Sequence, residues 1–145
     1  EDGVTKKGIT RYGQWYGNPY GEWSSMFMMF CLHYGQVDDD LIPVSPGVNN
    51  MMNLAQKAEV LSLPNQHINQ KGNILFLDMD GNKTADKLVI INAVEDDKLF
   101  VIGGDLDNEV KEMTMLSNDE RILGYLDMDQ IQEIWRLQML YLWWL

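Results

Sequence analysis

The sequence predicts an α+β fold, with helices in the N-terminal half, an antiparallel sheet of about five strands after them, and one more helix at the end of the chain. The apolar run over 23–34 is too long for an ordinary strand, and Gly35 follows it as glycine commonly follows a helix. A second helix is expected at 48–61, where apolar residues recur at helical spacing before Pro64. Helices followed by a run of strands are typical of the α+β class.

Five apolar segments separated by polar turns predict the strands. The expected strands lie at about 73–78, 87–94, 98–103, 109–116 and 121–126. Three acidic residues separate the second segment from the third, as in a hairpin-like polar turn.

Composition restricts the possible partners. The 145 residues suffice for one domain with a substantial core, and 46% hydrophobic residues indicate a globular chain. A net charge of −11 argues against nucleic acid and against an anionic membrane surface. No apolar run reaches 18 residues, so no membrane span is expected. The single cysteine, Cys31, allows no intramolecular disulfide and is expected to be buried and unreactive within its helix.

The N-terminal region divides into two parts. Residues 1–8 are polar and predict a flexible arm, and a first residue of Glu1 rather than Met fits a matured or excised segment. Residues 9–22 interleave glycines with aromatic residues, which suits either packing around a helix start or binding of sugar or peptide faces. The candidates for a substrate groove are Trp15, Tyr16, Tyr20 and Trp23.

The segment Glu22-Trp23-Ser24-Ser25-Met26-Phe27 follows this aromatic loop and begins the first long helix. It resembles the CHAP-like group of the NlpC/P60 and papain-like class of cysteine hydrolases, in which Trp-Cys stands at a helix N-terminus. The resemblance extends from about Ile9 to Tyr125. Ser24 stands where the nucleophilic cysteine of that family belongs.

A second motif continues the resemblance. The strand-like Gly72-Asn73-Ile74-Leu75-Phe76-Leu77 leads through an Asp/Gly-rich turn to Lys87, which stands where the family has its general-base histidine. In the next strand Gly103 occupies the commonest position of the family's orienting acid, and only Asp105 remains nearby. The resemblance therefore implies a papain-like fold whose nucleophile, base and orienter positions are Ser24, Lys87 and Asp105, all altered from the catalytic set.

The chemistry left at these positions is weak. A thiol at a helix N-terminus is driven towards thiolate by the helix dipole and a facing imidazole, whereas serine requires a strong positioned base. His33 lies nine residues after Ser24, on the opposite helix face, and His67 lies in a loop. A Ser24–Lys87 dyad is the alternative, but the acidic net charge disfavours the neutral lysine that it needs.

A second candidate site is a turn rich in oxygen side chains. The residues Asp78, Asp80, Asn82, Thr84 and Asp86 alternate around Gly81, as ligands of a hard cation such as Ca²⁺ do. The pattern resembles the first half of an EF-hand loop without its final bidentate glutamate, and Asp-Gly turns are common without metal. Structural Ca²⁺ and a plain turn both remain open, no other cofactor is required, and no zinc ligand set is present.

Residues 127–145 predict an appended helix that is apolar nearly all round and should therefore be buried. It can pack on its own sheet, on another subunit in a homo-oligomer, or on a protein partner. The expected interface residues are Trp135, Trp143 and Trp144.

The expected function is that of a catalytically inactive CHAP/NlpC-P60-like domain, residues 9–126, in a bacterial secreted or cell-surface protein. It would act in binding or assembly, with peptidoglycan peptides as its ligand; the resemblance supplies both the ligand and the extracellular location. One alternative is an active peptidoglycan amidase or endopeptidase whose cysteine has been replaced by Ser24, or a Ser–Lys hydrolase. Another is a scaffold that binds protein through the C-terminal helix.

Overall fold

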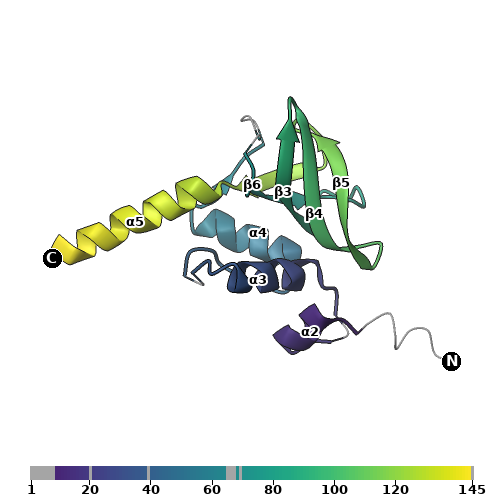
Figure 1. Cartoon of the computed structure of the whole chain (residues 1–145), viewed down its shortest axis with the longest axis horizontal. Coiled ribbons are helices and arrows are strands. Elements are labelled where there is room, and N and C mark those ends of the chain that lie inside the picture. The colour runs from purple at the N-terminus through teal and green to yellow at the C-terminus, as the bar shows by residue number, and fades with distance from the viewer. Residues whose placement is uncertain (1–8, 20, 39, 65–67, 69, 145) are drawn as a thin grey trace.

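The computed structural model describes residues 9–19, 21–38, 40–64, 68 and 70–144, so the arm expected at 1–8 lies outside the described residues. Two helices pack against a curved antiparallel sheet, a short helix packs on one of them, and the last helix projects away from the body of the domain (Figure 1). The predicted α+β class and the C-terminal helix are confirmed. No helix in the described ranges combines the length and apolar character needed to cross a bilayer.

In chain order the elements are α2 (Arg11–Tyr16), α3 (Ser24–Tyr34), α4 (Val48–Lys57), β1 (Leu61–Ser62), β2 (Ile74–Leu77), β3 (Lys87–Glu95), β4 (Lys98–Leu106), β5 (Glu109–Leu116), β6 (Ile122–Leu126) and α5 (Met128–Trp144). The sheet order is β1-β6-β2-β3-β4-β5, and every neighbouring pair is antiparallel.

Two local predictions were wrong. The helix expected at 48–61 ends at Lys57, the backbone turns at Glu59 with φ 60°, and Leu61 then pairs with Leu126. The sheet therefore has six strands rather than about five. The loop expected at 9–22 contains the short helix α2, because the Thr10 side chain accepts a hydrogen bond from the backbone N–H of Gly13 at 3.0 Å and caps its start.

Hydrophobic residues lie on both faces of the sheet. On one face, Met28 of α3 and Met51 and Ala55 of α4 pack against strand residues such as Phe76 and Leu88. Apart from Ile68, in the segment between β1 and β2, the cluster on the other face comes from the strands: Leu75, Leu77, Val89, Ile91, Leu99, Val101, Leu106, Met115, Ile122 and Tyr125. Because strand side chains bury one another there, the sheet must curl around them, as its curvature in Figure 1 shows.

Helix α3 lies unusually close to β4. A Cβ built on Gly104 would stand 2.5 Å from Cβ of Phe27 and 2.9 Å from Cζ3 of Trp23. Only a residue without a side chain fits at this contact, so Gly104 sets how closely the helix approaches the sheet.

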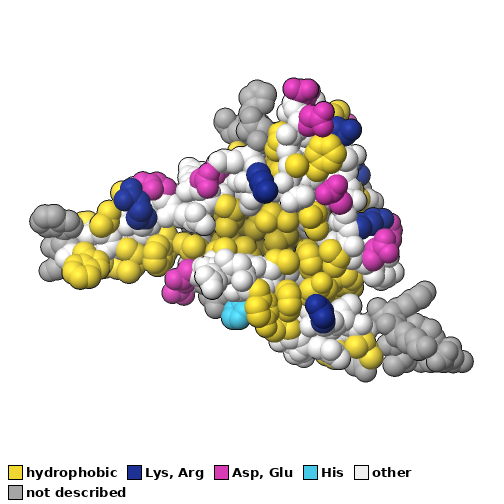
Figure 2. All heavy atoms as spheres, in the orientation of Figure 1, with side chains coloured by type: hydrophobic (Ala, Val, Ile, Leu, Met, Phe, Trp, Pro, Cys, Tyr) yellow, Lys and Arg dark blue, Asp and Glu magenta, His cyan; other side chains and the backbone are white. Residues whose placement is uncertain are grey.

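Helix α5 is mostly exposed, which corrects the expectation that it must be buried. Its first turn does enter the core, with Met128 and Ile131 among the buried residues. Beyond this root the described apolar side chains, apart from the half-buried Trp135, are exposed, up to 85% for Trp143 (Figure 2). The chain leaves the sheet at Leu126 in a direction that carries the helix off the domain, so packing of the whole helix on its own sheet does not occur.

Truncation should show that the root of α5 and its exposed part contribute differently to the stability of the domain. Removing 136–145 should leave the thermal unfolding midpoint nearly unchanged, because the described side chains of that segment are all exposed. Removing 128–145 should lower the free energy of unfolding by several kcal/mol, since burial of a side chain such as Met128 or Ile131 contributes about 1.5–3 kcal/mol. Equal stability of the two truncated proteins in urea titrations would contradict a core role for the root.

The close contact at Gly104 gives a second prediction. Gly104→Ala should destabilise the domain by about 1–3 kcal/mol, because the new methyl meets Cβ of Phe27, which cannot move without moving α3. Gly124→Ala is the matched control: it also lies in a strand, but its methyl would meet the flexible end of Leu61 at 3.0 Å. Denaturant titration should show a much smaller effect at Gly124 than at Gly104.

Candidate functional site

The structure brings Ser24, Lys87 and Asp105 to one junction, where the start of α3 meets β3 and β4. The hydroxyl oxygen of Ser24 accepts a hydrogen bond from the backbone N–H of Leu88 at 2.9 Å. Nζ of Lys87 lies 3.7 Å from Oδ2 of Asp105. The same carboxylate oxygen accepts a hydrogen bond from the backbone N–H of Trp23 at 3.2 Å. Residues that stand far apart in sequence therefore tie one helix end to two strands.

The geometry of β4 explains why the acid stands at 105 rather than 103. A Cβ on Gly103 would lie 2.8 Å from the carbonyl oxygen of Leu88 and 2.8 Å from Cγ1 of Val89, so no side chain fits there. The pairing of β4 with β5 is irregular between Gly103 and Leu106, and Asp105 adopts a left-handed backbone with φ 58°. Aspartate tolerates this conformation better than most residues. The irregularity allows the carboxylate to reach both Lys87 and the start of α3.

The charges at this junction stabilise the packing of the start of α3 on the sheet. The carboxylate of Asp105 lies at the N-terminal end of α3, where a negative charge interacts favourably with the helix dipole. The side chains of Lys87 and Asp105 are only 21% and 10% exposed. Removing one partner from such a pair leaves the other charge buried and unpaired, which is strongly unfavourable.

The hydroxyl of Ser24 has little of what a nucleophile needs. The residue is 2% exposed, and its hydrogen bonds among the described residues include no imidazole. His33 belongs to a pocket on another face of α3. His67 lies outside the described residues. Cys31 is no substitute, because burial raises the pKa of its half-buried thiol.

A pocket of about 440 Å³ opens beside Ser24, between the loop before α3 and the start of α4. Amide and carboxylate side chains on its wall provide hydrogen-bonding groups for a polar ligand. The residues that line it are Asn18, Glu22, Ser24, Met26, Pro46, Gly47, Val48, Asn49, Asn50, Ala85 and Asp86.

The four aromatic residues predicted to form a groove do not do so together. Trp23 is buried, stacks on Tyr12 with ring centroids 5.4 Å apart, and belongs to the core under α3. Trp15 and Tyr16 line a different pocket, and Tyr20 lies outside the described residues. The prediction of one shared aromatic groove is therefore wrong for Trp23, because the stacking partner of an aromatic ring depends on tertiary packing.

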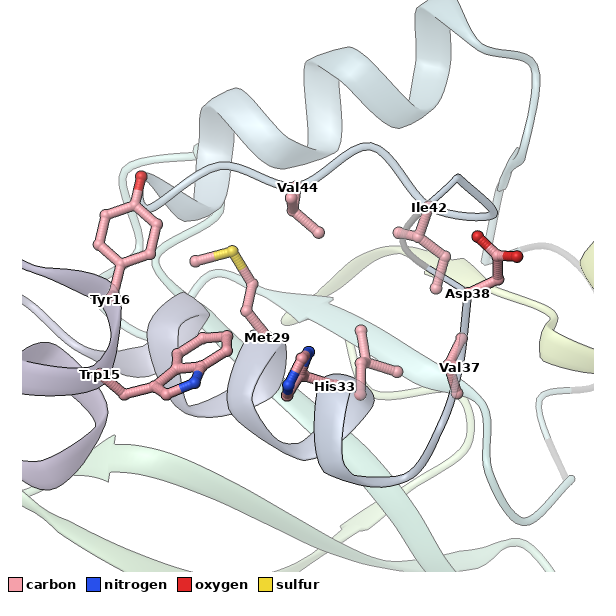
Figure 3. Close-up of a pocket in the computed structure, with 9 residues that line it drawn as sticks. Trp15, Tyr16, Met29, His33, Val37, Asp38, Ile42 and Val44 are labelled. Carbon is pink, nitrogen blue, oxygen red and sulfur yellow. The ribbon is translucent and has the colours of Figure 1, made fainter.

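Trp15 and Tyr16 line a second pocket, together with residues of α3 that the sequence did not indicate as ligand-binding. It has a volume of about 410 Å³ and is formed by α2, α3 and the segment after α3 (Figure 3). Trp15 also packs against the ring of His33, with centroids 5.4 Å apart. Met29 and His33 are four residues apart and therefore lie on one face of α3. This spacing is the sequence feature that indicates that they can share a pocket. The lining residues are Trp15, Tyr16, Met29, Leu32, His33, Val37, Asp38, Ile42 and Val44.

The Asp-rich turn between β2 and β3 is held together by its own backbone. The carboxylate of Asp78 accepts hydrogen bonds from the N–H groups of Gly81 and Lys83, both at 2.8 Å, and of Asn82 at 3.2 Å. Asp86 accepts hydrogen bonds from the N–H groups of Met79 and Asp80. Asn82 and Thr84 bond to each other, with the Thr84 hydroxyl donating at 2.7 Å. The turn is thus satisfied internally.

Carboxylate oxygens of Asp78, Asp80 and Asp86 nevertheless lie within 4.8 Å of one another. Desolvation raises the pKa of Asp78, but the N–H groups of Lys83, Gly81 and Asn82 outweigh it and leave the pKa below its usual range. For Asp80, the Asn82 N–H lowers the pKa, but desolvation and the neighbouring carboxylates leave it above its usual range. Asp78 therefore stabilises the fold above the unfolded-state pKa of about 3.9, and this contribution is lost as the pH falls through its lower folded value. The raised pKa of Asp80 has the opposite effect.

Asp80→Asn should raise the melting temperature at neutral pH, because it removes a crowded charge and keeps an acceptor for the Asn82 N–H. The gain should shrink as the pH falls towards 3, because the Asp80 carboxyl is then mostly protonated both in the unfolded state, with a pKa of about 3.9, and in the folded state, where its pKa is higher. Melting curves between pH 3 and 8 measure both effects. If millimolar Ca²⁺ raised the melting temperature of the unmodified chain but not of Asp80→Asn, the turn would be a cation site.

The three tryptophans predicted as interface residues differ in environment. Trp135 is half-buried and lines a groove of about 570 Å³ at the root of α5. Trp143 projects into solvent, and the side chain of Trp144 lies outside what the structure describes.

Comparison with known proteins identifies no family. No protein-family model matches the chain, and no curated protein matches it. Among solved structures, two crystal structures of Ly7917, one of them with the hydrolyzing product of MDP, align at 16% and 18% sequence identity with a TM-score of 0.38. Each alignment covers 48% of this chain and 32% of the other, so the match spans about a third of that protein. A TM-score this low carries no argument about fold or function.

Proposed function

We propose that residues 9–126 are a catalytically inactive CHAP/NlpC-P60-like domain with a papain-like fold, which acts in binding or assembly. The observation that supports this proposal is the meeting of Ser24, Lys87 and Asp105 at the start of α3. In the resembling family the nucleophile, base and orienter meet at such a junction, whereas the Ser24 hydroxyl bonds to the backbone N–H of Leu88. Here the same three positions hold the helix end on the sheet.

Inactivity follows from the contacts of the three residues. Activation of a serine requires a neighbouring base that takes its proton. The Lys87 side chain is the cation of an ion pair with Asp105. A protonated lysine cannot accept the proton of the Ser24 hydroxyl. The ion pair therefore argues against a Ser–Lys hydrolase. The absence of space for an acid at Gly103 argues against an active enzyme altered only at Ser24.

The pocket beside Ser24 is the proposed binding site, and peptidoglycan peptides are the proposed ligand. Its wall offers the amides of Asn18 and Asn50 and the exposed carboxylate of Glu22, while the Asp86 carboxylate, which also lines it, already accepts N–H groups of its own turn. Peptides carry both amide donors and acceptors, and stem peptides add amino groups that carboxylates can bind. A bacterial cell surface or secreted protein is the location that fits this ligand.

The unmodified chain should release no soluble product from purified peptidoglycan, because Ser24 lacks a base. Ser24→Cys should restore little, whereas Ser24→Cys with Lys87→His supplies both a thiol and an imidazole and should restore measurable turnover. Reducing-end and free-amine assays with chromatographic detection measure this. Turnover by the unmodified chain that Lys87→Ala abolishes would establish the dyad instead.

Binding is tested separately from hydrolysis. Insoluble peptidoglycan should retain the unmodified chain. The retained amount should fall at least several-fold for Glu22→Lys, because this substitution reverses a charge on the pocket wall. Glu133→Lys, on the exposed part of α5, is the matched charge control and should not affect retention. Equal retention of both variants would remove the pocket from the proposal.

A further inference from the structure

The exposed part of α5 carries a stripe that is symmetric about Gln138. Ile134 and Trp135 stand four and three residues before Gln138, and Tyr141 and Leu142 stand three and four residues after it. On an α-helix these positions share one face, with the glutamine at its centre. Trp135 is half-buried, but Ile134, Tyr141 and Leu142 are 39%, 66% and 61% exposed, so most of the stripe is uncovered within the described chain.

We propose that α5 pairs antiparallel with α5 of a second copy of this chain, with the two-fold axis passing at Gln138. A two-fold interface brings the same patch of both copies together. Ile134 then faces Leu142 of the second copy, and Trp135 faces its Tyr141. The two Gln138 amides meet on the axis and can bond to each other. A single polar residue within an apolar seam fixes the register and the number of helices.

The charges of α5 are compatible with this pairing. Glu133 and Arg136 lie on the opposite side of the helix and form an ion pair with each other at 2.7 Å. No charged residue of the helix therefore enters the seam. The net charge of −11 makes two copies repel each other. Because α5 projects from the domain, an antiparallel pair places the two domains at opposite ends, beyond the screening length of about 8 Å at physiological salt (Figure 1).

The groove at the root of α5 supplies the rest of the interface. From the dimensions of an α-helix, the helix pair alone buries about 700 Å² in total. Specific interfaces bury about 1,200–2,000 Å². The stripe residues Ile134, Trp135 and Gln138 also line the groove, whose other wall includes Leu41 and Pro43. In an antiparallel pair the last turns of the second helix extend over this groove, and the same happens on the other copy.

Two features of the groove set the salt dependence. Asp40 and Glu59 are exposed on its wall, and they face the negative end of the incoming helix dipole. This repulsion is screened by salt. Raising the salt concentration should therefore tighten the dimer.

Sedimentation equilibrium of the full chain tests the proposal with two matched variants. Leu142→Glu places a charge in the seam and should weaken dimerisation at least tenfold. Leu140→Glu makes the same chemical change on the other side of the helix and should leave the dimer intact. Both residues are exposed, 61% and 46%, so both variants should keep the melting profile of the domain.

A disulfide test reports on the position of the axis. In a Cys31→Ser background, Gln138→Cys places two thiols together on the two-fold axis and should form a dimer on mild oxidation. Arg136→Cys, on the opposite side of the helix, should not. Cross-linking of both variants to the same extent would overturn the proposed register.

Three other results would overturn the proposal. A monomeric chain at several hundred micromolar, in low and high salt, excludes self-pairing. Equal dissociation by Leu142→Glu and Leu140→Glu indicates a different assembly. A monomer that co-sediments with phosphatidylcholine vesicles and loses this property on Leu142→Glu assigns the stripe to a lipid surface. None of these results bears on the pocket beside Ser24, which is tested by peptidoglycan retention.

Discussion

Helix α3 can approach β4 closely because Gly104 offers no side chain between helix and sheet. At Gly104 the rings of Phe27 and Trp23 lie where a Cβ would otherwise stand. At Gly103 the neighbouring strand fills the space. This contact places the first turn of α3 within hydrogen-bonding distance of both strands. The candidate site, the pocket beside it and the packing of the helical layer all depend on this approach.

The residues at the start of α3 are suited to that structural role. The hydroxyl of Ser24 accepts the N–H of Leu88, the kind of bond for which a cysteine sulfur is a poor acceptor. Asp105 bonds to the N–H of Trp23 and pairs with Lys87. An imidazole and a thiolate would serve chemistry in this position. A hydroxyl, an ammonium and a carboxylate hold the start of α3 on the sheet, and under the proposed function the lack of catalysis and these contacts would have the same cause.

Sequence periodicity predicted the elements that bury apolar faces within the domain, and it was least informative where partners are distant or absent. The strands and α3 follow from their apolar runs, but β1 has only two residues and depends on pairing with Leu126. Motif order along the chain correctly indicated that Ser24 and Lys87 belong to adjoining helix and strand starts. The exposure of α5 could not be predicted, because an apolar pattern specifies that a surface needs a partner without specifying which one. The separation of Trp15 from Trp23 likewise depends on which rings stack in three dimensions.

The pocket beside Ser24 and the exposed stripe of α5 can act together, the pocket by binding a ligand and the stripe by pairing two copies of the chain. The pocket beside Ser24 has a volume of only about 440 Å³, so it can hold a short part of a peptide chain. An antiparallel α5 pair would hold two such pockets at opposite ends of a rod that is at least as long as the helix, about 26 Å for 17 residues. Linked sites on a polymeric ligand can raise the overall affinity by about 10²–10⁴ without any new contact. A polymer such as peptidoglycan repeats its peptides along and between its chains, so weak single sites and a rigid paired helix are compatible parts of one binding mechanism.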